Sequence, residues 1–136
     1  MLNIDNGEFG SVFNVVAHGK VALISWKNVK NRNAFNKKLA GDLQSIIEKI
    51  GADDNFHTIF LDPGVGVFCS GWDLDEIREV RGGSADDCGL LIDQGRACLD
   101  SINNSSCYVV AISQGHVLGF GISMLCNADH VIISQD

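Results

Sequence analysis

The sequence predicts an α/β fold in which strands and helices alternate along the chain. Three observations support this prediction: short β-branched and apolar runs recur, amphipathic helical segments separate most of them, and glycine-containing loops follow several of them. Such alternation is typical of a buried, largely parallel sheet. The 136 residues suffice for one domain, and 46% apolar with 20% charged residues is ordinary globular composition.

The first predicted elements are two strand-like runs at residues 12–16 and 20–26, separated by the short segment 17–19. This spacing predicts a β-hairpin. A helix is predicted to begin after Asn36, a favourable N-cap, and to end at Gly51. Its apolar side chains recur with helical spacing at Leu39, Leu43, Ile46, Ile47 and Ile50.

The remaining elements continue the alternation. They are a strand at 58–61, a helix at 88–102, a strand at 108–112, a short helix at 122–126 and a last strand at 131–133. Residues 76–87, rich in charged residues, glycine and serine, are expected to form a mobile stretch. No internal repeat and no domain boundary interrupts this order.

Composition and charge exclude several classes of function. The net charge of −7 argues against a nucleic-acid partner, because phosphate contact needs a basic face. No apolar run approaches the roughly 18 residues of a membrane span, and no histidine or cysteine set has metal-ligand spacing. The five cysteines are scattered and the first residues do not resemble a targeting peptide, so an intracellular protein is expected. The sequence favours none of the mitochondrion, the peroxisome and the cytosol.

Two glycine-containing loops, residues 70–74 and 115–121, follow predicted strands. Loops of this kind can direct backbone N–H groups into one space, as an oxyanion hole requires. The second loop also opens a helix, whose N-terminus adds unpaired N–H groups and a partial positive charge. Glycine-rich turns of purely structural purpose are equally common, and the loops alone leave that alternative open.

Taken with the segment Asn-Arg-Asn-Ala-Phe-Asn at 31–36, the two loops resemble the signatures of the crotonase (enoyl-CoA hydratase/isomerase) superfamily in order and spacing. Residues 127–134 are similar to the segment that follows the third signature. The resemblance extends from about residue 12 to residue 136 and covers the first half of a family domain. It implies a crotonase-like ββα spiral, truncated before the C-terminal helices, as a single partial domain over residues 1–136.

The resemblance also implies a site. The backbone N–H groups of Trp72 and Phe120 would form an oxyanion hole for the carbonyl of a coenzyme A thioester, the expected substrate or ligand, and no separate cofactor is expected. The residues implied in substrate binding are Lys30, Arg32, Asn33, Ala34, Ser70, Gly71, Asp73, Leu74 and Gly119. For Lys30 and Arg32, solvated loop charges remain the alternative. The nearby carboxylates of Asp73, Asp75 and Glu76 are expected to be loop caps or solvated charges.

One departure from the family pattern bears on catalysis. Hydratases of this family carry a glutamate two residues after the third signature, where this chain has Ser123. A serine hydroxyl cannot act as a general base at neutral pH without an adjacent base. The pattern is closer to the Δ3,Δ2-enoyl-CoA isomerase and chromodomain Y-like branch, whose proton-shuttling carboxylate comes later in the chain.

Two functions therefore remain open at this point. One is enoyl-CoA isomerisation or hydration through an enolate, with the general base absent from this chain. The other is a catalytically silent acyl-CoA-binding or assembly subunit. An apolar last strand predicts a partner in either case, as a trimer-type homo-oligomer or as a subunit of a larger complex.

Overall fold

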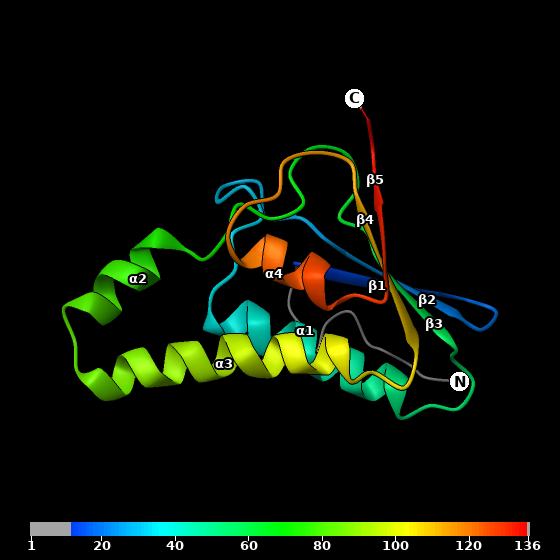
Figure 1. Ribbon diagram of the computed structural model, residues 1–136, viewed down its shortest axis with the longest axis horizontal. Helices are drawn as coiled ribbons and strands as arrows, with labels where there is room; N and C mark the ends of the chain where they lie inside the picture. Colours follow the sequence, from blue (N-terminus) through cyan, green and yellow to red (C-terminus); the bar gives the residue numbers. More distant parts are fainter. Residues whose placement is uncertain (1–11, 136) are drawn as a thin grey trace.

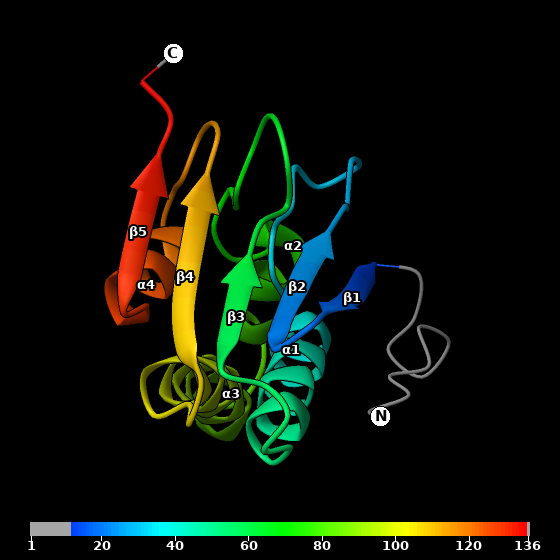
Figure 2. The ribbon, with the colours of Figure 1, turned by 90° about the vertical axis from the view of Figure 1, so that its right-hand side faces the viewer.

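Five strands form one sheet in the order β1-β2-β3-β4-β5 in the computed structural model, which describes residues 12–135 (Figures 1 and 2). β1 and β2 pair as an antiparallel hairpin, and β2 to β5 pair in parallel. The predicted α/β fold is confirmed. The strands are β1 (Phe13–His18), β2 (Val21–Trp26), β3 (Thr58–Leu61), β4 (Tyr108–Ser113) and β5 (His130–Ile133).

Helices cover one face of this sheet, as Figure 2 shows. α1 (Lys37–Gly51) and α3 (Ala85–Asn103) pack against each other, and α4 (Phe120–Asn127) packs on α3. α2 (Leu74–Arg81) lies at one end of the molecule, beyond the sheet (Figure 1). The core between the helices and the sheet is apolar and includes the fully buried Ile24, Leu43, Ile47, Ile59, Leu61 and Val109.

The prediction of a mobile stretch at 76–87 is wrong. The structure places α2 up to Arg81, and it begins α3 at Ala85, three residues before the predicted start. Local capping explains the difference. The Asp73 carboxylate accepts hydrogen bonds from two N–H groups of the first turn of α2, and Ser84 forms a capping box at the start of α3. α2 buries no side chain, so its hydrophobic pattern could not reveal it.

Three loops meet at the carboxyl ends of the parallel strands. The loop after β3 and the loop after β4 are joined by N–H···O bonds from Phe68 to His116 (2.9 Å) and from Leu118 to Cys69 (2.9 Å). The loop after β2 joins them through a parallel bridge between Phe35 and Trp72. In open α/β sheets this edge is where ligands bind. The fold therefore brings all three predicted signature segments together.

The opposite face of the sheet carries no helix within residues 12–135 (Figure 2). Its strand register aligns Val16, Leu23, Phe60 and Val110 in one row across four strands. At the free edge, Ile132 of β5 faces the same side beside Ile112 and is 46% exposed. Apolar side chains thus occupy a sheet face that the described part of the chain leaves open.

Candidate functional site

Two glycines bring the second and third loops into close contact. Gly71 has φ 104° and Gly119 has φ 50°, a region that side-chain-bearing residues rarely adopt. A Cβ atom built on Gly119 would lie 3.4 Å from the Cα of Gly71, and one on Gly71 would lie 3.6 Å from the Leu118 carbonyl oxygen. Because a Cβ would be in ordinary van der Waals contact at both positions, the positive φ values, and not lack of space, favour glycine there.

The residues that follow these glycines present backbone donors without an acceptor. Within residues 12–135, no hydrogen bond uses the N–H of Trp72 or of Phe120, whereas the amide that follows each of them is paired. Asp73 donates to the Phe35 carbonyl (2.7 Å), and Gly121 donates to the Leu118 carbonyl (3.0 Å). Phe120 is also the first residue of α4, where the helix dipole favours negative charge. Two such donors side by side are suited to an oxygen that acquires charge.

A cavity of about 470 Å³, here called the loop cavity, opens beside Trp72, while Phe120 is not among its lining residues. It brings together six of the residues predicted to bind substrate or to form the oxyanion hole, namely Arg32, Ala34, Ser70, Trp72, Asp73 and Leu74. Leu118 and Arg78 also line it and were not predicted from the sequence. Leu118 lies inside the glycine loop 115–121, which was itself predicted to be part of the site, so its place in the sequence could have indicated it. Arg78 belongs to the unpredicted helix α2.

The other predicted binding residues have different surroundings. Asn33 holds the loops together, because its side chain donates to the Val67 carbonyl (2.6 Å) and accepts from the Asn28 N–H (2.7 Å). Lys30 is exposed on the same loop and lines none of the cavities described here. Arg32 also lines a neighbouring cavity of about 500 Å³ together with Lys27. Arg32 therefore borders both cavities, and Lys27 borders the second one.

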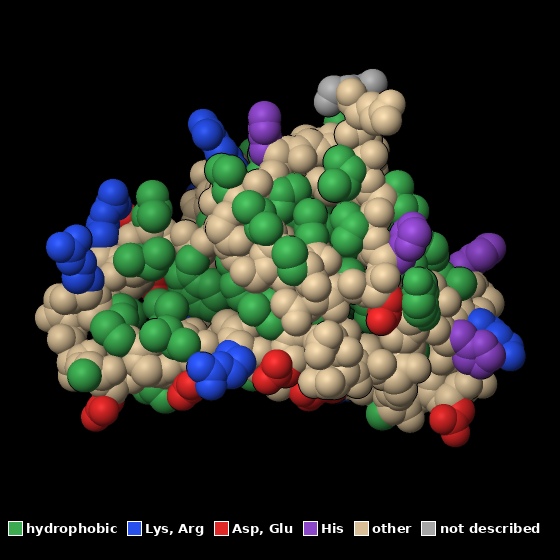
Figure 3. Space-filling model, viewed as in Figure 1, with side chains coloured by type: hydrophobic (Ala, Val, Ile, Leu, Met, Phe, Trp, Pro, Cys, Tyr) green, Lys and Arg blue, Asp and Glu red, His purple; other side chains and the backbone are tan. Residues whose placement is uncertain are grey.

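A second cavity, here called the apolar cavity, lies on the other side of Trp72. Its volume is about 460 Å³, within the usual range of ligand pockets. Hydrophobic side chains gather in the hollow between α2, α3 and α4 in Figure 3. No carboxylate is among its lining residues, which include Trp72, Ile77, Leu91, Leu99, Phe120 and Ser123. Ser123, half-buried in α4, thus borders an apolar space rather than a polar one.

The three nearest carboxylates have structural hydrogen bonds. Asp73 caps α2 and accepts from the Asn31 amide (2.7 Å), which confirms the prediction of a cap. Asp75 pairs with Arg78 at 2.7 Å on the surface of α2. Glu76 is not a solvated charge, because it accepts from the Trp72 indole N–H (2.6 Å) and from the Lys37 N–H (3.0 Å). The four-residue spacing of Trp72 and Glu76 was the one sequence signal for this contact.

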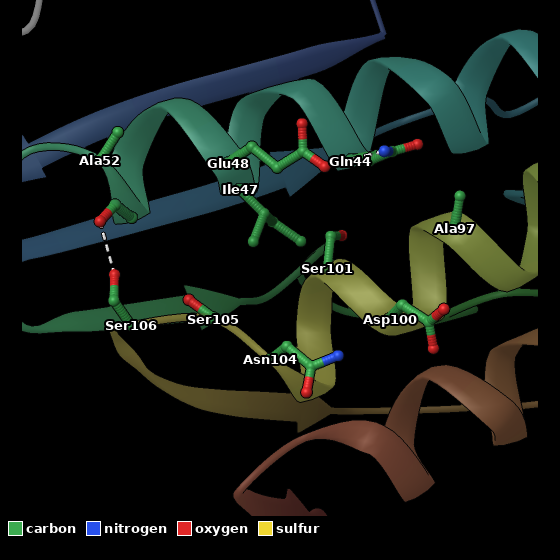
Figure 4. A pocket seen from close by; sticks show the side chains of 11 residues that line it. Gln44, Ile47, Glu48, Ala52, Ala97, Asp100, Ser101, Asn104, Ser105 and Ser106 are labelled. Carbon is green, nitrogen blue, oxygen red and sulfur yellow. Dashed lines mark hydrogen bonds between the residues drawn. The ribbon is translucent and has the colours of Figure 1, made fainter.

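A further cavity, of about 570 Å³, lies between the C-terminal ends of α1 and α3 (Figure 4). Polar side chains such as Gln44, Glu48, Ser101 and Asn104 surround it. It contains none of the predicted residues and no unpaired buried donor or acceptor. We therefore place the candidate site at the loop cavity and the apolar cavity.

Two other kinds of site are absent from residues 12–135. No group of three or more His, Cys, Asp or Glu side chains is arranged to hold a metal ion. None of the four described helices combines the length and apolarity that crossing a bilayer demands.

Comparisons with known proteins identify a family. The model of the Enoyl-CoA hydratase/isomerase family matches residues 17–136. "Probable enoyl-CoA hydratase 2, mitochondrial" of Arabidopsis thaliana is 30% identical over 106 residues, which are 77% of this chain and 34% of that protein. "Probable enoyl-CoA hydratase EchA14" of Mycobacterium tuberculosis is 26% identical over 109 residues, covering 80% of this chain and 41% of that protein.

Solved structures give the same result for the fold. An enoyl-CoA hydratase/isomerase from Marinobacter aquaeolei superposes with a TM-score of 0.82 at 26% identity, over 90% of this chain and 48% of that one. AtuE of Pseudomonas aeruginosa superposes with a TM-score of 0.86 at 23% identity, over 92% of this chain and 48% of that one. The chain spans about a third to a half of the length of the curated relatives that it matches.

The family match covers most of the chain, and the superposed structures share its sheet and helices. The resemblance seen in the three loop signatures is therefore confirmed by independent comparisons of sequence and of structure. The chain belongs to the enoyl-CoA hydratase/isomerase family and has the crotonase fold.

Proposed function

We propose that this chain binds an acyl-CoA thioester where the Gly71 and Gly119 loops meet. In this proposal the N–H groups of Trp72 and Phe120 donate to the thioester carbonyl oxygen and stabilise the enolate formed from it. The carrying observation is that these two adjacent donors have no acceptor within residues 12–135. Removing one donor from an oxyanion hole typically lowers turnover by about 10²–10³. The effect of such a pair of donors is therefore large enough to support a function.

The shape and charge of the neighbouring cavities support the same ligand. The loop cavity leads to the donors from the side of Arg32, and Lys27 and Arg32 border the adjoining cavity. Arginine and lysine are suited to the phosphates of coenzyme A. The apolar cavity lies beyond Trp72 and has hydrophobic walls. The ligand would thus extend from a cationic loop surface to the donors, with its acyl group directed toward Trp72.

The reaction proposed from family membership is isomerisation or hydration of an enoyl-CoA. Both need a group that moves a proton at the carbons next to the carbonyl. Among the described residues, Ser123 borders the apolar cavity, and the carboxylates of Asp73 and Glu76 already accept structural hydrogen bonds. These contacts favour the second candidate function, an acyl-CoA-binding subunit that does not catalyse the reaction by itself.

Calorimetric titration with butyryl-CoA tests the binding proposal. Gly71→Val and Gly119→Val would displace the two donors, since valine strains a backbone of positive φ and its methyl groups extend beyond a Cβ that already touches the facing backbone. Both variants are expected to lose binding. Gly19→Val is the matched control, because Gly19 has a comparable φ of 59° in the β1–β2 turn, with no atom near its Cβ position. Equal affinity in all three variants would contradict the proposal.

Turnover distinguishes the two candidate functions. An enzyme that lacks a positioned acid or base loses about 10²–10⁴ in rate. We expect isomerase and hydratase turnover of this chain near background, and Ser123→Ala is expected to change neither turnover nor butyryl-CoA affinity. Robust turnover that survives Ser123→Ala and Asp73→Asn would refute the silent-subunit alternative.

We further propose that the chain functions as a subunit of an oligomer or of a larger complex. The support comes from the open sheet face, where Val16 and Leu23 are 47% and 36% exposed, and from β5, where Ile132 and Ile133 are 46% and 63% exposed. Monomeric proteins rarely leave contiguous apolar surface of this kind in water.

A further inference from the structure

Trp72 occupies the boundary between the two cavities of the candidate site. Trp72 lines both the loop cavity and the apolar cavity, and it is half-buried. Its backbone N–H is one of the two donors without an acceptor. A group bound at that donor therefore lies next to the side chain of the same residue, whatever the rest of the ligand is.

The indole is held in one orientation by Glu76. Its Nε1–H donates to the Glu76 carboxylate at 2.6 Å, a short charge-assisted bond. The same carboxylate accepts from the N–H of Lys37, the first residue of α1, at 3.0 Å. A carboxylate at a helix N-terminus is stabilised by the helix dipole. Glu76 thus links Trp72 to two helices that are distant in the sequence.

Packing restrains the ring on its other sides. The Trp72 ring contacts the Phe120 ring edge-to-face, with centroids 5.0 Å apart, and Phe120 packs on the buried Phe35 at 5.6 Å. Under this pair lies Gly95 of α3, where a Cβ would come within 3.4 Å of the Trp72 ring and 3.6 Å of the Phe120 ring. The indole can move toward neither Phe120 nor α3 without displacing them.

We infer that Trp72, fixed by Glu76, is a wall that limits the acyl group to short chains, and that Glu76 is its positioning residue. The inference rests on the proposed function, because it takes the thioester carbonyl to be bound at the Trp72 N–H. The first carbons of the acyl group then meet the indole, which separates them from the apolar cavity. Removing the wall joins that cavity to the binding path and admits longer chains.

Binding of saturated thioesters tests this inference without requiring turnover. Affinities for butyryl-CoA and octanoyl-CoA are measured by calorimetry for the wild type, Trp72→Ala, Glu76→Leu and Glu76→Gln. We expect Trp72→Ala to shift the affinity ratio toward octanoyl-CoA by about tenfold or more, the discrimination that methylenes provide in an apolar pocket. Glu76→Leu, which frees the indole, shifts the ratio in the same direction. Glu76→Gln keeps an acceptor for the indole N–H and retains the wild-type ratio.

The outcomes separate this inference from the proposal beneath it. If no ester binds to the wild type, the proposed function fails and this inference fails with it. If the esters bind and the ratio is the same in the wild type, Trp72→Ala and Glu76→Leu, the inference alone is overturned. If a thermal melt shows that Trp72→Ala does not fold, the inference is tested by comparing the affinity ratios of Glu76→Leu and Glu76→Gln. A ratio that shifts equally in both Glu76 variants would refute the positioning role.

Discussion

Two cysteine thiols lie deep in the molecule and give it a defined response to alkali. Burial raises the pKa of Cys69 from its ordinary value of 9.0 to about 11, and burial raises the pKa of Cys98 to about 12. Unfolded cysteines lose their protons near their ordinary pKa, while the folded chain retains them. Unfolding therefore releases protons above pH 9, and the free energy of unfolding falls as the pH rises from about 9 toward 11.

The corresponding prediction compares slopes rather than absolute stabilities. Between pH 8 and pH 10.5, chemical denaturation of Cys69→Ala and Cys98→Ala is expected to show a shallower loss of stability with pH than the wild type. Cys126 is exposed, so Cys126→Ala should keep the wild-type slope. Identical slopes in all four proteins would show that the two buried thiols ionise as freely in the folded chain as in the unfolded one.

At the scale of single residues, the family resemblance pointed to the N–H groups of Trp72 and Phe120 but not to the contacts of the side chains around them. Trp72 and Phe120 follow glycines in motifs with fixed spacing, and a backbone N–H does not depend on the side chain that follows it. The role of Glu76 was not predictable in the same way. It depends on α1 and α2 meeting at Trp72, a contact between segments that local propensity does not describe.

At the scale of elements, the loops after β3 and β4 depend on one close backbone contact. A Cβ at Gly115 would overlap the carbonyl oxygen of Gly66, so the two loops can run side by side only with glycine at this position. The contact also supports the neighbouring bridge between Val65 and Gln114. Because these loops carry the donors of the candidate site, their spacing matters for binding as well as for stability.

Two glycine substitutions are therefore expected to act in opposite directions. Gly115→Ala forces the loops apart and should lower both the free energy of unfolding and the affinity for butyryl-CoA. Gly89 lies inside α3 with open space around its Cβ position, so Gly89→Ala should raise stability by about 0.5–1 kcal/mol. Chemical denaturation measures both effects. Destabilisation by Gly89→Ala, or none by Gly115→Ala, would contradict this account of the loops.

Among the elements, hydrophobic periodicity predicted α1 and the buried strands, and it failed for α2. The apolar positions of α1 repeat with helical spacing and all face the core. α2 buries nothing and is defined by Asp73 at its N-terminus and by contact with α3. Its charged sequence, Leu-Asp-Glu-Ile-Arg-Glu-Val-Arg, is compatible with either a helix or a mobile loop, and only the caps decide between them.

At the scale of the whole molecule, the open face of the sheet is the surface through which the proposed association would occur. Ile132 of β5 shares this face with Ile112, and burying one such side chain contributes about 1.5–3 kcal/mol. We expect Ile132→Lys to disperse an assembly or to make the protein insoluble, and Asn104→Lys, which adds the same charge beyond α3, to leave it intact. Sedimentation velocity measures the outcome. A well-folded wild-type monomer at high concentration, unchanged by Ile132→Lys, would rule out the proposed association.

The overall architecture followed from the order of the segments, because strands that alternate with helices form parallel pairs in few arrangements. The apolar run of β4 predicted a strand buried in the middle of a sheet, and β4 lies between β3 and β5. The meeting of Gly71 with Gly119 was implied only through the family resemblance. Contacts across such sequence separations come from the packing of the whole chain, which no local window contains.

The central claim, that the Trp72 and Phe120 N–H groups receive the thioester carbonyl, can be tested most directly by amide NMR. Adding butyryl-CoA to ¹⁵N-labelled protein is predicted to move the backbone amide protons of these two residues downfield, because each gains an acceptor. Both shifts should saturate at the ligand concentration that calorimetry gives for binding. Saturable binding that leaves these two amide protons unshifted while others move would contradict the claim.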